Sequence, residues 1–255
     1  MQNITRLYAL SKRNVILRYK NSLAGFFWGF FKPLLFLLIF IVIFSSAFLK
    51  SNDFPSLNNY VIFTSAGLIF WFFFSNVTNQ AIGSVVGSSG LIKSLNVPVI
   101  FFPMADIVSE LFNFALTLVV FLVIMYWFGI SYSFKMLLII PCILLFSIFS
   151  FGIIMLLSSL NVFFRDVGIM WGTIQPALFY MTPIAYPESM ITDKYRLIIK
   201  CNPIYYFIKL GRSIFYDPVA PPMAQWMHCM LIAAIMFMMG LYVFNKLKNQ
   251  FISTI

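Results

Sequence analysis

Long apolar stretches dominate this chain and constrain its fold more than any other feature. Hydrophobic residues make up 62% of the 255 positions and charged residues only 9%. A soluble domain of this size carries far more charge, so the composition predicts a polytopic membrane protein with little mass outside the bilayer. Because an open sheet leaves backbone groups unpaired in lipid, we expect the fold class to be all-α.

Length and hydropathy indicate about six transmembrane helices in a single transmembrane domain, 1–255. Each crossing needs roughly 20 apolar residues. The segment 185–222 is too polar to cross lipid and too apolar for a free loop, and prolines and glycines divide it. We therefore expect two short re-entrant or interfacial helices there, about 188–200 and 203–216, on the outer side. The predicted spans are 30–49, 60–82, 104–128, 136–160, 168–184 and 223–244.

The distribution of lysine and arginine indicates how the chain is oriented. With the N-terminus in the cytoplasm, nine of the assigned basic residues fall inside and seven outside. Five of those nine precede the first span, where the bias weighs most, so we expect both termini in the cytoplasm. The net charge of +10 fits a surface of anionic lipid. No basic run is dense enough to follow a phosphate backbone, so we expect no nucleic-acid partner.

The first 22 residues predict an amphipathic helix lying along the cytoplasmic surface of the membrane. At about 100° per residue, Ile4 and Tyr8 share an apolar stripe, while Arg6 and Arg13 lie on the opposite side. Such a helix rests its stripe in the interface and offers cations to headgroups or to a partner. A simple positively charged anchor is the alternative interpretation.

Motifs for catalysis or metal binding are absent from the sequence. The segment 87–94 superficially resembles a phosphate loop, but its glycine spacing is wrong and no strand precedes it. We find no nucleophile elbow, no metal-ligand spacing and a single histidine, His228. Asp106 and Glu110 share one face near the inner end of the third span, where carboxylates are costly unless paired or hydrated. We therefore expect no enzyme, no metal and no cofactor in this chain.

Small and aromatic residues allow two interpretations each. Three Gly-x-x-x-Gly pairs let helices approach closely, either within the chain or in a dimer. The 32 phenylalanines serve as lipid-facing bulk, or some of the aromatic residues line a path for sugars, whose C–H faces stack on rings. The glycine pairs are Gly25/Gly29, Gly83/Gly87 and Gly168/Gly172, and the possible channel aromatics are Phe27, Trp28, Phe70 and Trp71.

Five short motifs follow one another over nearly the whole chain. They are Arg18 to Trp28 with Lys32-Pro33, Gly90 to Lys93 before Phe102-Pro103, Asn161 to Val167, Thr182 to Pro187, and Asn202-Pro203 running to Arg212. Each is weak alone. In this order they resemble the polysaccharide-export permeases of ATP-binding-cassette transporters, which serve O-antigen, teichoic acid and capsule. Lys32 and Lys209 depart from the family pattern, in which a polar amide and an acidic residue are common.

The resemblance implies a half-transporter that forms a homodimer and pairs with two separate ATPase subunits, which would bind the ATP and magnesium. It implies a polysaccharide linked to undecaprenyl diphosphate, moved from cytoplasm to periplasm through a channel at the dimer interface in the bacterial inner membrane. Two alternatives stay open. One is a permease of the same fold for a drug, haem or small lipid, and the other is a membrane enzyme of glycan assembly.

The same resemblance assigns roles to particular residues. A cytoplasmic coupling helix within 86–98 would dock in the ATPase through Leu91, Ile92, Lys93 and Ser94. The residues that would lie at the cytoplasmic interface and contact the lipid diphosphate are Arg13, Arg18, Lys20, Arg165 and Asp166. The external gate region, 185–222 and the turn before it, would depend on Pro183, Tyr186, Pro187, Asn202 and Pro203.

Overall fold

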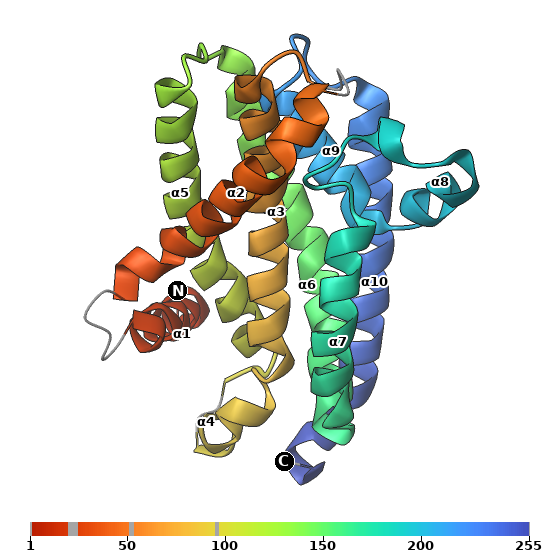
Figure 1. The fold of residues 1–255 in the computed structure, drawn as a ribbon. Coiled ribbons are helices and arrows are strands. Elements are labelled where there is room, and N and C mark those ends of the chain that lie inside the picture. The colour runs from red at the N-terminus through yellow and green to blue at the C-terminus, as the bar shows by residue number, and fades with distance from the viewer. Residues whose placement is uncertain (1, 20–24, 51–53, 95–96, 255) are drawn as a thin grey trace.

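The computed structural model describes residues 2–19, 25–50, 54–94 and 97–254. Every regular element within these ranges is a helix, which confirms the all-α prediction. Long helices run side by side, while α1 lies across them and the short α4 projects beyond one end (Figure 1). The helices are α1 (Gln2–Tyr19), α2 (Gly25–Lys50), α3 (Leu57–Ile82), α4 (Ser89–Ser94), α5 (Phe101–Trp127), α6 (Ile139–Phe163), α7 (Asp166–Met181), α8 (Asp193–Lys200), α9 (Pro203–Phe215) and α10 (Met223–Thr254).

Among the described residues, four helical segments are long and apolar enough to cross a membrane. Three are α3, α5 and α10, and the fourth joins the 3₁₀ helix η2 (Phe134–Leu138) to α6. The other two predicted spans also fall on helices, but the apolar part of α2 covers Phe31–Phe44 and α7 has 16 residues. The chain is therefore a multi-pass membrane protein, and six crossings remain a prediction.

Helices α6 and α10 approach each other closely at two glycines. A Cβ atom on Gly152 would overlap the backbone of Met236, and one on Gly240 would overlap the backbone of Gly152. Only glycine lets two helices approach to this extent. By contrast, a Cβ on Gly83, Gly87 or Gly172 would meet nothing within 4 Å, so those members of the predicted glycine pairs are not used for packing within the chain.

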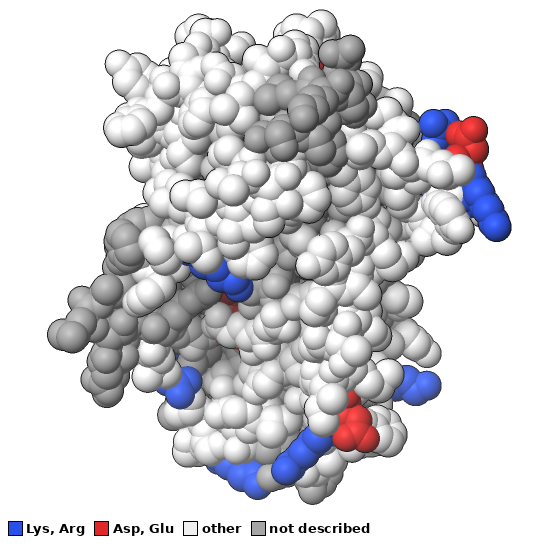
Figure 2. Space-filling model, in the orientation of Figure 1, with Lys and Arg blue, Asp and Glu red and all other residues white. Residues whose placement is uncertain are grey.

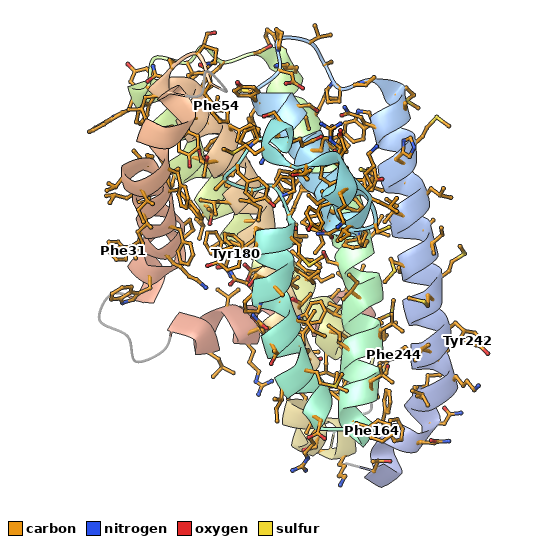
Figure 3. All side chains as sticks on the ribbon, turned by 45° about the vertical axis from the view of Figure 1, so that its right-hand side comes forward. Phe31, Phe54, Phe164, Tyr180, Tyr242 and Phe244 are labelled. Carbon is orange, nitrogen blue, oxygen red and sulfur yellow. The ribbon has the colours of Figure 1, made fainter. Side chains whose placement is uncertain are left out.

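A cluster of phenylalanine rings fills the centre of the bundle. Phe146 and Phe149 of α6 stack against Phe207 of α9, with ring centroids 4.9 and 4.7 Å away. Phe70 of α3 joins the same cluster, at 5.7 Å from Phe146. Such ring pairs add to the free energy of simple burial. Most buried apolar side chains between the helices form one large cluster, and a second, small cluster holds Phe54 and Tyr60. Tyr242, by contrast, points outward from α10 (Figure 3).

The aromatic residues predicted to line a channel have different environments. Phe70 is fully buried and Trp71 is 5% exposed, both within this single chain. In this conformation neither ring reaches a surface along which a channel could run. Trp28, on α2, is 58% exposed. The side chain of Phe27 lies outside the described residues.

Candidate functional site

The predicted coupling segment forms a compact turn and helix at one end of the bundle. After α3 ends at Ile82, the 3₁₀ helix η1 (Val86–Ser88) leads directly into α4. Ile92 is buried and anchors α4, while Lys93 and Ser94 are exposed. Leu91 is partly buried against the core. The arrangement presents polar atoms outward on an apolar anchor, as a docking surface requires, and docking itself remains a prediction.

The predicted interface residues do not form one cluster in the described structure. Arg13 is exposed on α1, which packs against α5. Arg165 and Asp166 are exposed at the start of α7, which packs against α3 and α6. Asp166 lies in the first turn of its helix, where the dipole favours a negative charge. The side chain of Arg18 and all of Lys20 lie outside the described residues.

Asp106 and Glu110 are buried on α5 and take amide groups as partners. Asn14 and Gln80 donate to the Asp106 Oδ1 at 2.8 and 2.7 Å. Asn76 and Asn113 donate to the two Glu110 carboxylate oxygens, each at 3.0 Å. This explains how carboxylates are tolerated at this depth. The amide partners of these carboxylates on α3 were not predicted from the sequence. Asn76 and Gln80 nevertheless stand four residues apart in an apolar span and so face the same side.

The predicted gate residues surround the start of α9. The Asn202 side chain accepts from the backbone N–H of Ile204 at 3.0 Å, and Pro203 occupies the first turn, which together begin the helix. The Asn202 amide also donates to the Thr182 hydroxyl at 2.8 Å. The Tyr186 hydroxyl donates to the carbonyl of Tyr180 at 2.8 Å. The Asn202–Thr182 bond joins the end of α7 to the start of α9 across the 3₁₀ helix η3 (Glu188–Met190) and α8, while the Tyr186–Tyr180 bond closes the turn after α7.

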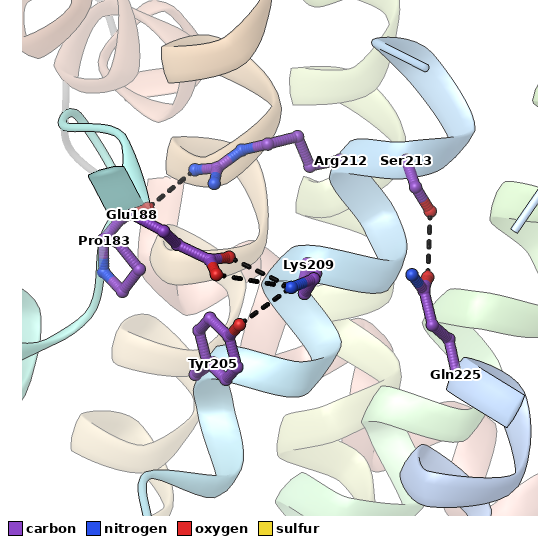
Figure 4. A network of polar contacts seen from close by, with 7 residues as sticks. All are labelled: Pro183, Glu188, Tyr205, Lys209, Arg212, Ser213 and Gln225. Carbon is purple, nitrogen blue, oxygen red and sulfur yellow. Dashed lines mark hydrogen bonds and ion pairs between the residues drawn. The ribbon is translucent and has the colours of Figure 1, made fainter. Parts of the chain in front are cut away.

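Arg212 of α9 is 7% exposed and is held by backbone carbonyl groups. Its Nη2 donates to the carbonyls of Pro183 and Ile184 at 2.8 and 3.0 Å, and its Nε donates to Phe63 at 3.2 Å. The guanidinium also lies 3.5 Å from the centroid of the Phe63 ring. Burial lowers the pKa of Arg212 to about 9, so the group stays charged at neutral pH. Arg212 thus ties α9 to α3 and to the turn after α7 (Figure 4).

One turn earlier on α9, Lys209 makes a more exposed polar contact. Its Nζ lies 3.2 Å from the Glu188 carboxylate and donates to the Tyr205 hydroxyl at 2.9 Å (Figure 4). Burial alone would lower the pKa of Lys209, but the Tyr205 hydrogen bond and the Glu188 charge raise it above its ordinary value. Burial also raises the pKa of Tyr205. Lysine at position 209 is therefore matched by an acidic partner from η3.

The fold is that of a helical, multi-pass membrane protein. The chain belongs to the ABC-2 type transporter family, whose model matches residues 5–216. It is 31% identical to "O-antigen export system permease protein RfbA" of Klebsiella pneumoniae, over 96% of this chain and 93% of that one. It is 25% identical to RfbA of Myxococcus xanthus, over 98% and 95%. It is also 25% identical to "Capsule polysaccharide export inner-membrane protein CtrC" of Neisseria meningitidis, over 94% and 90%. The family resemblance inferred from the motifs is confirmed.

Proposed function

We propose that this protein is the membrane subunit of an ATP-driven exporter that carries a polysaccharide such as O-antigen across the bacterial inner membrane. The observation that supports this best is the likeness to the Klebsiella pneumoniae O-antigen permease, which extends over nearly the full length of both chains. Both termini lie in the cytoplasm, and the six long helices cross the bilayer. Export of a polymer rather than of a drug or small lipid is favoured because the relatives described above are named for O-antigen or capsule.

Two ATPase subunits supply the energy to a homodimer of this chain and bind the ATP and magnesium. Each docks on α4, where exposed Lys93 and Ser94 stand above the buried anchor Ile92. A displacement of α4 passes to α3 because only the short η1 turn separates them. It passes on to α6 because the buried Asn161 amide donates to the carbonyl of Ile82, the last residue of α3, at 3.1 Å.

The substrate is a polysaccharide linked to undecaprenyl diphosphate, which travels through a channel at the dimer interface. Exposed Arg13, with Arg18 and Lys20, meets the diphosphate from the cytoplasmic side. On the outer side, α8 and α9 form the gate. The Lys209–Glu188 pair is half-exposed and separates at low cost. Arg212 keeps the base of α9 fixed to α3, so opening hinges at the turn that contains Pro183, Tyr186 and Pro187.

Deletion of the gene in its host tests this function. Lipid-linked glycans are then fractionated by the side of the inner membrane on which they lie. We expect undecaprenyl-linked polymer to accumulate on the cytoplasmic face and surface polysaccharide to disappear, and a plasmid copy of the gene to restore both. Unchanged surface polysaccharide without internal accumulation would contradict polymer export and favour a small-molecule substrate.

A plasmid copy carrying Lys93→Glu separates coupling from folding. Lys93 is exposed, so the variant should reach the membrane in normal amounts yet fail to restore export. Its matched control is Lys135→Glu, a partly exposed lysine on η2, which should restore export fully. Normal export by the Lys93→Glu variant would contradict docking through α4.

A further inference from the structure

A polar cavity of about 670 Å³ lies between α1, α3 and α5. Its size is within the range of small-molecule sites, roughly 300–1,000 Å³. Eight of its fourteen lining residues are polar, including Arg13, Asn14, Gln80 and Asp106. In Figure 2, acidic atoms are visible in a recess on this side of the molecule, next to a basic side chain. The other acidic groups that are plainly visible on that face lie at the upper right and near the lower edge, away from this recess.

Two buried oxygen atoms of residues that line this cavity have no hydrogen-bond partner among the described residues. They are Asp106 Oδ2 and Ser84 Oγ. Asp106 is 3% exposed, and its other carboxylate oxygen already accepts from Asn14 and Gln80. A buried oxygen without a partner is unfavourable. The two atoms come from α5 and from the turn after α3, and both residues line the cavity.

The chemistry of the lining selects the kind of molecule. A fully ionised anion has no hydrogen to donate to Asp106 Oδ2, so that oxygen would stay without a partner. A metal ion would find Arg13 in the lining and only one carboxylate oxygen free of amide partners, since Asn76 and Asn113 donate to Glu110. A hydroxyl group suits the site because it donates to a carboxylate oxygen and can pair with the Ser84 hydroxyl as donor or acceptor. Several neighbouring hydroxyls would also use the amide groups of Asn14, Asn79 and Gln80.

We propose that this cavity binds a sugar unit of the exported glycan, through Asp106, Ser84 and the surrounding amides. This inference rests on the proposed function. It identifies the cavity as the place on the protein where the glycan is held at the membrane. The glycan, rather than its lipid carrier, is recognised here. Asp106 Oδ2 accepts from one sugar hydroxyl, and Ser84 exchanges a hydrogen bond with another.

The test uses the complete transporter, with its ATPase partner, in lipid nanodiscs. The probe is water-soluble polysaccharide released by mild acid from the host's own surface glycan, and binding is followed by saturation-transfer NMR. Asp106→Asn keeps Oδ1 as the acceptor for Asn14 and Gln80 and replaces only the free oxygen. Ser84→Ala removes the second oxygen with little change in volume. Asp217→Asn, an exposed carboxylate at the far end, is the matched control.

We expect saturable binding whose apparent Kd rises at least tenfold in Asp106→Asn and several-fold in Ser84→Ala, with Asp217→Asn unchanged. Undecaprenyl phosphate without sugar should not compete. The proposal would be overturned if both cavity variants bound the polysaccharide with the affinity of the native protein. It would also be overturned if the native protein showed no saturable binding, or if undecaprenyl phosphate competed fully. Loss of surface glycan on gene deletion together with unaffected binding in the variants would retain export and reject the cavity, whereas unchanged surface glycan would reject both.

Discussion

The two ends of the bundle bury polar groups in opposite ways. At the end that carries α9, Arg212 is enclosed by three backbone carbonyls and an aromatic ring, and a Cβ on neighbouring Gly211 would overlap the ring of Phe70. At the end that carries α4, Asp106 keeps one oxygen without a partner among the described residues, beside a cavity of about 670 Å³. A filled and paired site holds helices in place, whereas an open and unpaired site receives a ligand. Stability should therefore depend on the Arg212 site, and binding of the proposed sugar unit on the Asp106 site.

Arg212→Met should have the largest effect on stability. Methionine leaves three carbonyls without their donor, so we expect the folded state to lose about 3 kcal/mol or more. Thermal unfolding of the purified protein in detergent, followed by size-exclusion chromatography, measures the loss. Arg196→Met, which removes an exposed ion pair with Asp193, should change stability by less than about 1 kcal/mol. Equal losses in the two variants would remove the distinction between the buried and exposed arginines.

Gly211→Ala should have the next largest effect. The added methyl group would overlap the Phe70 ring, and overpacking of this kind destabilises by about 1–3 kcal/mol. Gly172→Ala is the matched control, because nothing lies within 4 Å of its added Cβ and alanine favours a helix. The same unfolding assay compares the two. An unfolding temperature of Gly211→Ala at or above that of Gly172→Ala would contradict the close packing of α9 on α3.

Lys209→Met should have a smaller effect, at most about 1 kcal/mol, because the pair with Glu188 is half-exposed. Salt screens such a pair, so the difference from the native protein should shrink as ionic strength rises. The unfolding temperatures of the variant and the native protein at low and at high salt measure this difference. A loss as large as that of Arg212→Met, independent of salt, would show that Lys209 rather than Arg212 fixes α9.

Asp106→Asn should have the smallest effect on stability, below about 1 kcal/mol, because asparagine keeps the oxygen that accepts from Asn14 and Gln80. Asp106→Ala removes that acceptor and should be clearly less stable than Asp106→Asn in the same assay. If the two variants were equally destabilised, the free oxygen would be part of the structural framework, and the contrast between the two ends would disappear.

Sequence patterns predicted the parts of this fold that local chemistry determines. Hydropathy located all six long helices, and the proline and glycine breaks located α8 and α9. Contacts between distant segments could not be read from these patterns. Arg212 reaches Phe63, 149 residues away, and the α6–α10 contact pairs Gly152 with Gly240, which no short motif joins. The burial of Phe70 depends on α9, which folds back against α3, so it too could not be read from a local pattern.

The candidate site was predicted only in outline, because local patterns mark some of its residues whereas contacts between distant segments determine the rest. Lys93 and the start of α9 are marked by local turn and capping residues, and the structure places them at a helix surface and a helix cap. Asp106 and Glu110 stood out as costly carboxylates, but their amide partners come from three helices. The unpaired oxygen became visible only when those partners were placed.

ATP-driven movement of glycan across the membrane is the most direct test of this protein's role. Inside-out vesicles from the host carry lipid-linked polymer on their exposed face, where membrane-impermeant periodate oxidises it. With ATP present, we expect the polymer to become protected in vesicles that contain the native protein, and to stay exposed in vesicles with the Lys93→Glu variant. Equal protection with and without ATP, or with and without this chain, would contradict the export function.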